Sequence, residues 1–449
     1  MKTINRSTSS TTFENINFQN NYKLWEYLEL SVSADRSYYG LKPEALFEMG
    51  LRVNKKRQFL FISKLIAKHL AVHPAIALGT GSLLSSLLME NTGLAPHPDA
   101  ERIAVMIDSG EPDTALMQKA LQYKKELPGK TVFIGMAETA TGLGHATFQH
   151  FLGADYIHTT REAITGSEPS FVFEEEHSHA TSHKVYAPEG MLEEAETIVL
   201  VDDEISTGNT LINLVEALDD QFPGKCYKCL SILDWRNSTQ RAKMDEFTAR
   251  RGIQADVLAL MSGEFTLHHG QSPEDVAAEK LAGDTGATLK EIMTETVARS
   301  SATNQRYIPY TGRFGLSSAK QKELEQWIED AAAKIAPLLA GEKALVIGIG
   351  ENMYVPLRFA LALGGDVKVQ TTTRSPIHAA QTPGYPIQEK AAFQLPDMGS
   401  VDQYIYNLGQ VKADRIYLIA ESVIQREEWL PLVSYLEEKA PLEWISLTN

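Results

Sequence analysis

The residues best suited to chemistry lie in one short segment, residues 199–210, where the chain reads VLVDDEISTGNT. An apolar run ends there in two adjacent acids, Asp202 and Asp203. The loop that follows groups hydroxyl side chains around a glycine: Ser206, Thr207, Gly208, Asn209 and Thr210. Loop amides, hydroxyls and a helix N-terminus suit a phosphate, and carboxylates at a strand end can accept hydrogen bonds from vicinal hydroxyls. The segment therefore suits a ribose 5-phosphate.

The order of these residues resembles the 5-phosphoribosyl 1-pyrophosphate (PRPP) motif of type I phosphoribosyltransferases. That motif has a hydrophobic strand, two acids, two variable positions, Thr or Ser, Thr, Gly and one more hydroxyl, and this segment contains every element. The resemblance implies that Asp202 and Asp203 hold the ribose hydroxyls, with or without a water-bridged Mg²⁺, and that residues 206–210 bind the 5-phosphate. The competing interpretation is a strand followed by an ordinary capped helix, because Asp is common in such turns.

A second loop of small residues lies upstream, in FIGMAETATGLGHA at residues 133–146. A strand leads into the loop and a helix follows it, so that main-chain amides could wrap a diphosphate. In the resembling family the pyrophosphate loop lies here, and the resemblance assigns that role to Ala137, Glu138, Thr139 and Ala140. Tight packing of a strand on a helix also selects small residues, so that composition alone leaves both interpretations open.

Arg161 ends the next strand, in YIHTTRE, where related orotate phosphoribosyltransferases have a basic residue that faces pyrophosphate. A guanidinium group binds phosphate bidentately, although a surface arginine is the plain alternative. Type I enzymes place a flexible catalytic loop after this point, and here that loop contains His177, His179 and His183 among several acids. Protonated histidine could neutralise departing pyrophosphate or act as a general acid, whereas a solvated loop and a transition-metal site are the alternatives.

Two further motifs have weaker chemical interpretations. SILDWRN parallels the strand end that faces the base in orotate phosphoribosyltransferases, so that Trp235 could stack on a base and Arg236 could meet an acidic substituent. Plain core packing of Trp235 is the competing interpretation. The only cysteines, Cys226 and Cys229, form a CxxC without a second pair, which favours a strand over a zinc or redox site.

Composition limits the class of protein. The 449 residues suggest two or three domains, and 43% apolar residues are near the globular average. The 42 basic and 58 acidic residues give a net charge of −16, which argues against nucleic acid as a partner. No stretch predicts a membrane span or a signal peptide, and two cysteines are typical of a reducing compartment, so that we expect a cytoplasmic protein.

Strands alternate with helices along most of the chain, which predicts an α/β fold with a doubly wound parallel sheet of the type I phosphoribosyltransferase kind. Residues 24–48 and 54–72 predict helices within its first part. The expected order is a disordered arm at 1–22, a phosphoribosyltransferase domain at 23–270, a polar helical connector at 271–305 and a second α/β domain at 306–449.

The second domain resembles the first in sequence. Residues 130–161 align without gaps on residues 343–374 at an offset of 213, with 7 identities in 32 that include the final Thr-Thr-Arg. Residues 195–218 align on residues 413–436 at an offset of 218, with 6 identities. The order and the similar offsets indicate an internal repeat.

The repeat has lost the chemistry of the first copy. Ala420 and Glu421 stand where the first copy has its two acids, and residues 424–428 (IQREE) replace the phosphate loop, where their acids would repel a phosphate. We therefore expect a degenerate phosphoribosyltransferase-like domain that packs on the first as a second subunit would. In this intramolecular pseudo-dimer Arg374 could reach the shared cleft. A homodimer of whole chains is also open.

The segment TTTRSPI in the second domain points to a closer family. With AETATGLGH, EEEHSHATSH, VDDEISTGNT and GRFG, it resembles the phosphoribosyltransferases of bacterial tellurite-resistance (ter) gene clusters, which have a C-terminal TRSP domain. The resemblance implies a Mg²⁺-dependent transferase in a nucleotide-like biosynthetic or stress pathway, with PRPP and an unknown base acceptor as partners. A PRPP-binding regulator without turnover, or a PRPP-consuming lyase or hydrolase, would use the same site.

Overall fold

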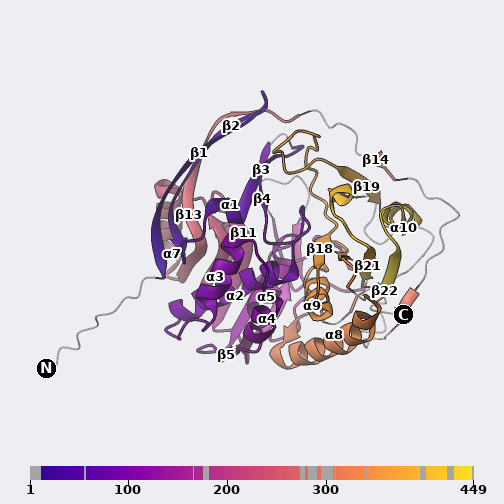
Figure 1. Cartoon of the computed structure of the whole chain (residues 1–449). Helices are drawn as coiled ribbons and strands as arrows, with labels where there is room; N and C mark the ends of the chain where they lie inside the picture. Colours follow the sequence, from indigo (N-terminus) through magenta and orange to yellow (C-terminus); the bar gives the residue numbers. More distant parts are fainter. Residues whose placement is uncertain are drawn as a thin grey trace.

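The main sheet has eight strands in the order β1-β2-β13-β12-β11-β6-β8-β16, and the five strands from β13 to β8 run parallel (Figure 1). The α/β fold class predicted from the sequence is confirmed. The strands are β1 Phe13–Leu24, β2 Leu28–Tyr38, β6 Thr131–Gly135, β8 Asp155–His158, β11 Thr197–Ile205, β12 Cys226–Asp234, β13 Gln254–Gly270 and β16 Leu316–Ser317. The computed structural model describes residues 12–54, 57–164, 166–174, 182–273, 279–281, 291–294, 307–308, 310–339, 341–394, 401–421 and 429–446.

Two helices, α2 (Pro74–Asn91) and α5 (Ala140–Phe148), pack on each other and against the parallel strands. Helix α2 is buried around nearly its whole circumference, which is typical of a helix in the middle of a core. Gly81 allows its close approach to α5, because a Cβ there would lie 2.6 Å from Ala146. The other helices of the first domain are α1 Pro43–Leu46, α3 Ala100–Ser109, α4 Thr114–Ala120, α6 Asn209–Gln221 and α7 Ser238–Arg251.

The second domain has a parallel sheet of its own, in the order β15-β22-β21-β17-β18 (Figure 1). These strands are β15 Glu291–Thr294, β17 Ala344–Gly348, β18 Val367–Thr371, β21 Arg415–Ala420 and β22 Leu442–Ser446. A smaller sheet joins β14 Glu279–Lys280, β19 Lys390–Gln394 and β20 Asp402–Tyr406. Its helices are α8 Ser318–Leu339, α9 Tyr354–Leu363 and α10 Leu430–Glu437. No helix in the described ranges is long and apolar enough to cross a membrane.

Three short two-stranded pairs complete the fold. The antiparallel pair β3–β4 stands over the carboxyl end of the main sheet, and we call β3, β4 and the described residues between them the hood (Figure 1). The pair β9–β10 follows β8 in the chain, and the pair β5–β7 is parallel. The bounds are β3 Phe47–Leu51, β4 Phe59–Ser63, β5 Lys125–Glu126, β7 Phe151–Leu152, β9 Phe171–Glu174 and β10 Ser182–Val185.

The second domain repeats the topology of the first. The strand order β8-β6-β11-β12 recurs as β18-β17-β21-β22. The register recurs as well: Ile134 lies opposite Leu200, and Ile347 lies opposite Leu418, the same positions at the sequence offsets of 213 and 218. The sequence repeat and the structural repeat therefore coincide strand by strand.

Hydrogen bonds at the ends of the matching strands recur in the same positions. The Ala137 amide donates to Thr159 Oγ1 at 2.8 Å, and the Gly350 amide donates to Thr372 Oγ1 at 2.9 Å. The residue after each threonine pairs with the second strand of a hairpin, β10 in the first domain and β20 in the second. The repeat thus extends from the sheets to the loops that follow their strands.

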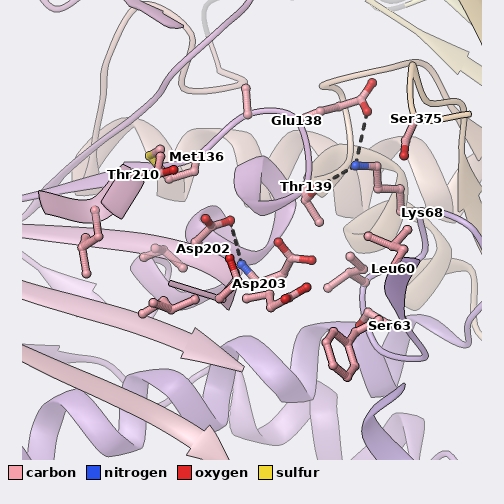
Figure 2. A pocket seen from close by; sticks show the side chains of 18 of the residues that line it. Leu60, Ser63, Lys68, Met136, Glu138, Thr139, Asp202, Asp203, Thr210 and Ser375 are labelled. Atoms are coloured by element: carbon pink, nitrogen blue, oxygen red, sulfur yellow. Dashed lines mark hydrogen bonds and ion pairs between the residues drawn. The ribbon is translucent and has the colours of Figure 1, made fainter. Parts of the chain in front are cut away.

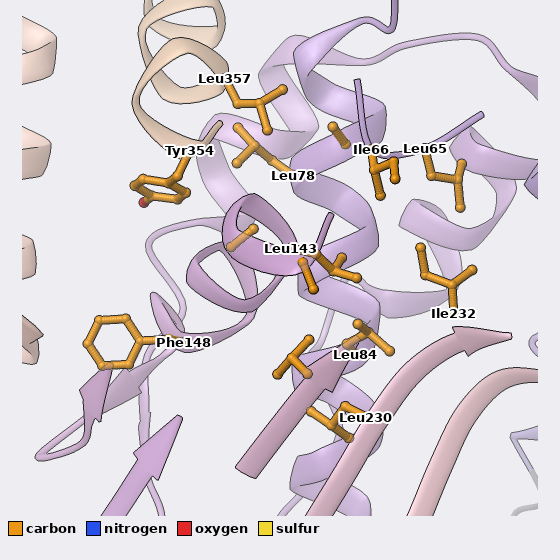
Figure 3. Close-up of a cluster of buried hydrophobic side chains, with 14 of the residues drawn as sticks. Leu65, Ile66, Leu78, Leu84, Leu143, Phe148, Leu230, Ile232, Tyr354 and Leu357 are labelled. Carbon is orange, nitrogen blue, oxygen red and sulfur yellow. The ribbon is translucent and has the colours of Figure 1, made fainter. Parts of the chain in front are cut away.

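One hydrophobic core cluster extends across both domains. Tyr354 and Leu357 of α9 lie beside Leu78 of α2 in the same buried cluster (Figure 3). His145 of α5 stacks on Tyr354 with ring centroids 3.6 Å apart. Because the equivalent helices α5 and α9 pack directly on each other, the second domain is a fixed part of the structure around the first.

Several elements differ from those expected from the sequence. Residues 13–22, expected in a disordered arm, form most of β1, and the helix expected at 24–48 contains β2. Side chains from Leu28 to Ala34 alternate between buried and half-buried, which is the period of a strand. The helix expected at 54–72 contains β4, whose aromatic and β-branched residues favour a strand. Described parts of the expected helical connector form β14 and β15.

Candidate active site

A pocket lies at the carboxyl ends of β6 and β11, where parallel α/β sheets bind their ligands. Four parts of the chain contribute most of its wall: β11 with the loop after it, the loop after β6, the hood with the segment leading to α2, and a short segment of the second domain. Arg161 after β8 and residues of β12 and α6 also line it. Figure 2 shows residues from all four parts around one space: Asp202, Thr210, Glu138, Leu60, Lys68 and Ser375.

Strand β11 continues through both acids of the motif and brings a third acid into the pocket. The Asp203 amide donates to Asp202 Oδ1 at 2.9 Å. The next residue, Glu204, is buried, and its Oε1 lies 2.5 Å from Arg57 Nη2 of the hood. Burial raises the pKa of Glu204, and the charge of Arg57 opposes that rise.

The loop after β11 has the conformation that its glycine permits. Gly208 has a φ of +80°, and a Cβ there would lie 2.8 Å from Cδ of Arg236, so that both the backbone angle and the space require glycine. The loop ends at the N-terminus of α6, where helix amides and the helix dipole favour an anion. Four of the five predicted phosphate-binding residues line the pocket: Ser206, Thr207, Gly208 and Thr210.

The loop after β6 presents amides and a lysine to the same pocket. The amides of Ala137 and Ala140 donate within the protein, to Thr159 Oγ1 and to the Met136 carbonyl respectively. No hydrogen bond from the amides of Glu138 or Thr139 is found within the described residues. Lys68 Nζ donates to Thr139 Oγ1 at 2.6 Å and is nearly buried. The loop can therefore offer main-chain donors and a cation to an anionic ligand.

Glu138 ties this loop to the second domain. Its carboxylate accepts hydrogen bonds from Thr373 Oγ1 at 2.6 Å and from the Arg374 amide at 3.2 Å, and Lys68 Nζ lies 3.4 Å away. Burial alone would raise the pKa of Glu138, but Lys68, the Thr373 hydroxyl and the guanidinium groups of Arg161 and Arg374 outweigh burial and lower it. The ionised Glu138 thus anchors a loop surrounded by positive charge.

Five predicted site residues within the described ranges do not line the pocket: Ala140, His183, Asn209, Trp235 and Arg236. Trp235 is 1% exposed and stacks on Phe61, with ring centroids 4.9 Å apart. Because Phe61 lines the pocket, the Phe61 ring separates Trp235 from the pocket. Arg236 forms a buried bidentate pair with Asp234 at 2.8 and 2.9 Å, and packs beneath the glycine of the phosphate loop.

The other residues outside the pocket wall have structural contacts. His183 is buried, and its Nδ1 lies 2.9 Å from Thr159 Oγ1, the oxygen that accepts the Ala137 amide. His183 therefore supports the loop after β6 from behind. The Asn209 side chain accepts a hydrogen bond from Lys243 at 2.7 Å. His177 and His179 lie outside the described residues, so that the catalytic role expected for them stays a prediction.

Sequence reasoning missed three cations of the wall, Arg52, Arg57 and Lys68. Arg57 and Lys68 lie in residues 54–72, which the sequence predicted to be a helix, and Arg52 lies just before them. Antiparallel pairing of β3 with β4 instead turns this part of the chain back over the sheet and brings Arg52 and Arg57 to the pocket. The aromatic run at residues 59–61 was the local signal for the strand.

In the second domain, the position equivalent to this pocket is occupied by Arg313. Its Nη1 lies 2.5 Å from Glu351 Oε2 and its Nη2 lies 3.3 Å from Glu421 Oε1, and the side chain is 2% exposed. Glu351 and Glu421 are the counterparts of Glu138 and Asp203 at the repeat offsets. Burial raises the pKa of Glu421 to about 7, although Arg313 opposes that rise.

The donor set fits a magnesium ion that arrives with a ligand. No group of three or more His, Cys, Asp or Glu side chains suited to hold a metal occurs in the part of the chain that the structure describes. Mg²⁺ is commonly bound through one or two carboxylates together with substrate phosphates and water. The adjacent carboxylates of Asp202 and Asp203 at the pocket wall match that requirement.

Comparison with protein families matches residues 46–264 to the family described as phosphoribosyl transferase, and residues 310–436 to the TRSP domain located C-terminal to it. Comparison with curated proteins finds no match. The chain therefore combines a segment that matches the phosphoribosyl transferase family with a segment that matches the TRSP domain C-terminal to it, as the sequence predicted.

Solved structures with partial similarity include two adenine phosphoribosyltransferases. The enzyme from Trypanosoma brucei, solved with AMP, pyrophosphate and ribose-5-phosphate, is 18% identical over 29% of this chain and 55% of its own, with a TM-score of 0.22. The enzyme from Leishmania tarentolae is 18% identical over 30% and 62%, with a TM-score of 0.22. A hypoxanthine phosphoribosyltransferase from Staphylococcus aureus is 11% identical over 38% and 68%, with a TM-score of 0.20. The chain thus spans less than two thirds of the length of either adenine enzyme.

Proposed function

We propose that the protein transfers the 5-phosphoribosyl group of PRPP to a nitrogenous base or a related acceptor and releases pyrophosphate. A nitrogen of the acceptor forms a bond to C1 of the ribose while the bond from C1 to the pyrophosphate oxygen breaks. The observation that carries this proposal is that an acid pair, a glycine-hydroxyl loop and a cationic loop line one pocket.

Each part of PRPP has matching chemistry in that pocket. The 5-phosphate fits residues 206–210 at the start of α6, and the ribose hydroxyls fit the carboxylates of Asp202 and Asp203. The pyrophosphate fits the amides of the loop after β6. Positive charge around the leaving group stabilises the negative charge that develops on it. Three cations supply that charge: Lys68, Arg161 and Arg374.

Asp202 and Asp203 would hold Mg²⁺, directly or through water, together with oxygens of PRPP. When bound, the ion offsets the charge of the pyrophosphate. The loop that contains His177 and His179 follows the hairpin strand β9 in the chain, and in our proposal it closes over the pyrophosphate and excludes water, with His183 as its inner support.

The TRSP domain completes the pyrophosphate end of the site in this proposal. Arg374 and Ser375 line the pocket, and the Arg374 amide binds Glu138 of the loop after β6. The repeated topology and the shared core support an intramolecular pseudo-dimer, in which the second domain stands where a second subunit would. A homodimer of whole chains is not required to complete the pocket.

The wider setting follows from the sequence resemblance. We propose a cytoplasmic enzyme of a nucleotide-like pathway associated with bacterial tellurite resistance. The acidic net charge of −16 supports small-molecule partners rather than nucleic acid.

Binding of Mg-PRPP to the full chain tests the proposal first. Gly208→Ala should weaken binding by at least about tenfold, because a Cβ at this left-handed position would meet Arg236. Gly224→Ala is the matched control: Gly224 has a φ of +79°, but a Cβ there meets nothing within 4 Å. Calorimetry of both variants, with thermal unfolding of each, separates a lost site from a lost fold. Equal affinities in the two variants would contradict the phosphate site.

Turnover is tested separately with Mg-PRPP and a panel of nitrogenous bases, by measuring pyrophosphate release. Release that depends on one class of base supports the transferase. Release without any acceptor would indicate a PRPP hydrolase or lyase. Tight binding of Mg-PRPP without release would instead indicate the regulatory protein that the sequence also allowed.

A further inference from the structure

Arg374 reaches the pocket from the second domain and is held at both ends. Its amide donates to Glu138 Oε1 at 3.2 Å, and its Nη2 lies 3.1 Å from Glu162 Oε1. The Arg374 side chain is 17% exposed and the Glu162 side chain is 8% exposed. Arg374 lines the pocket, whereas Glu162 is not among the described residues that do. The Glu162 carboxylate therefore contacts the guanidinium group from outside the pocket.

Glu162 is itself fixed by residues of the segment that leads into α8. The Tyr307 hydroxyl donates to Glu162 Oε2, and Arg313 Nη1 lies 3.9 Å from the same oxygen. Arg313 Nη1 also donates at 3.0 Å to Thr160 Oγ1, which accepts the Glu162 amide at 3.1 Å. The backbone and one carboxylate oxygen of Glu162 are thus held within the protein, and the other oxygen, Oε1, accepts from Arg374.

The repeat does not reproduce this ion pair on its other side. At the offset of 213, Arg374 corresponds to Arg161 and Glu162 corresponds to Ser375. The local backbone does recur, because the amides of Glu162 and Ser375 each donate at 3.1 Å to the hydroxyl of the threonine two positions earlier. A serine cannot form an ion pair with an arginine. The carboxylate at this turn is therefore specific to the side that holds Arg374.

A guanidinium group that is already fixed binds an anion at lower entropic cost, because a free arginine side chain loses rotamer freedom on binding. The group has five N–H donors in a planar fork, so that contact of Arg374 Nη2 with Glu162 leaves donors for a second partner. The charge of the Glu162 carboxylate opposes an anionic ligand, but Arg313 offsets that charge from the other oxygen. The gain from orientation therefore outweighs the repulsion.

We infer that Glu162 is a positioning residue, which orients the Arg374 guanidinium group toward the pyrophosphate end of the pocket. Glu162 does not touch the ligand and acts through Arg374. A carboxylate of the first domain thus holds a cation of the second domain at the site, so that recognition of pyrophosphate is shared between the domains. This inference rests on the proposed function, because pyrophosphate is a product of the proposed reaction.

Binding of two separate ligands to the full chain tests the inference by calorimetry. Glu162→Gln keeps the size of the side chain and removes the charge that holds Arg374. It should weaken Mg-pyrophosphate, titrated in saturating ribose 5-phosphate, about fivefold. Ribose 5-phosphate titrated alone should bind within about twofold of wild type, because its phosphate fits the loop after β11. Loss of both ligands to the same extent would mean a structural role and would overturn the inference.

A double-mutant cycle establishes whether Glu162 acts through Arg374. Arg374→Met alone should weaken Mg-pyrophosphate about tenfold, and addition of Glu162→Gln should change that affinity by less than about twofold. Glu421→Gln is the matched control, because it removes another buried carboxylate that contacts Arg313, at 3.3 Å. It should leave Mg-pyrophosphate affinity within about twofold of wild type. Additive losses in the cycle, or an equal loss in Glu421→Gln, would overturn the assignment.

The remaining outcomes are also decisive. Unchanged affinity for Mg-pyrophosphate in Glu162→Gln would contradict the inference, and tighter binding would mean that the carboxylate competes with the ligand for Arg374. If thermal unfolding shows that Glu162→Gln is not folded, the same titrations of Glu162→Asp decide, because aspartate keeps a charge beside Arg313 but withdraws the carboxylate from Arg374 by one methylene. Absence of both ligands from the wild-type chain would instead reject the proposed function.

Discussion

The two domains have the same strand order, but the loops after their strands make different contacts. The carboxylate of Glu138 accepts a hydrogen bond from the Arg374 amide at 3.2 Å, and the carboxylate of Glu351 accepts one from the Arg161 amide at 3.3 Å. Each domain therefore fixes the other through equivalent residues, since Glu351 lies 213 positions after Glu138 and Arg374 lies 213 positions after Arg161. This reciprocity is what a symmetric dimer interface would show. The domains differ in the cation that contacts each glutamate, which is Lys68 for Glu138 and Arg313 for Glu351.

In the first domain Lys68 approaches Glu138 and Thr139 from the segment that leads into α2. In the second, Arg313 comes from the segment that leads into α8, and it reaches both Glu351 and Glu421. Glu421 is the counterpart of Asp203, so that the arginine spans the place that the ribose would occupy in the first domain. Lys68 contacts Glu138 but not the acid pair, so that Asp202 and Asp203 stay accessible to a ligand. Arg313 contacts both Glu351 and Glu421, so that its side chain fills the equivalent site of the second domain.

The comparison teaches that the domains differ in more than the motif. The second domain lacks the acid pair and the phosphate loop in its sequence, and it also places an internal cation against its acids. Three carboxylates approach Arg313, from Glu162, Glu351 and Glu421, at 3.9, 2.5 and 3.3 Å. Because buried carboxylates need a partner, the closed site contributes to stability where the open site contributes to binding.

The largest expected effect is on stability, in Arg313→Met. Removal of this cation takes away the guanidinium group that contacts three buried carboxylates, which typically costs about 3–5 kcal/mol. Lys68→Met is the matched variant of the first domain, and we expect a smaller loss there, because Glu138 keeps the Thr373 hydroxyl and the Arg374 amide. Denaturant unfolding of both variants measures the difference. Equal losses in the two variants would mean that the two cations have the same role.

The next effect is on turnover, in Asp203→Asn. Removal of one charged group that stabilises the reacting centre typically reduces kcat by about 100–1,000-fold. Glu421→Gln changes the equivalent position of the second domain and should leave pyrophosphate release within about twofold of wild type. Circular dichroism confirms that both variants are folded. Unchanged kinetics in Asp203→Asn would refute the assignment of the acid pair.

The part of this site that the sequence predicted is the part whose chemistry is local. Residues 202–210 run continuously from a strand into a helix, so that their order alone fixes which groups share a strand end. The repeat was also visible, because the gap-free offsets of 213 and 218 in sequence place equivalent residues in the same register in the two sheets. The family matches then agreed with the motif and with the TRSP segment.

The part that the sequence did not predict depends on contacts between distant segments. Lys68 reaches Glu138, 70 positions later, only because the hood folds back over the sheet. Trp235 directly follows strand β12 at the edge of the sheet where the pocket lies, but Phe61 of the hood lies between Trp235 and the pocket. Arg313 lies in the GRFG segment that contributes to the family resemblance, but its role could not be predicted, since that role depends on acids from three other elements. Periodicity and spacing do not report such packing.

A moderate effect is expected for Arg374→Met, which removes the cation that the second domain contributes to the pocket. We expect the KM for PRPP to rise about tenfold with little change in kcat, because the guanidinium binds the pyrophosphate in both the ground state and the transition state. Arg161→Met, its counterpart in the first domain, should behave alike. If only Arg161→Met raised KM, the TRSP domain would contribute structure and no charge to the site.

The smallest effect is the dependence of stability on pH. The sign of this dependence differs between Glu421 of the second domain and Glu138 of the first. The pKa of Glu421 is raised from 4.5 to about 7 by burial, so that between these pH values the folded chain holds a proton that the unfolded chain lacks. This stability is fully present below pH 4.5 and is lost as the pH rises through about 7. For Glu138, whose pKa is lowered despite burial, stability is instead present above the usual pKa and lost as the pH falls.

Unfolding of wild type and Glu421→Gln at about pH 5 and pH 8 isolates the contribution of Glu421, because the neutral amide does not titrate. Wild type should lose stability relative to the variant on going to the higher pH, and a difference of the opposite sign would mean that Arg313 keeps Glu421 ionised throughout.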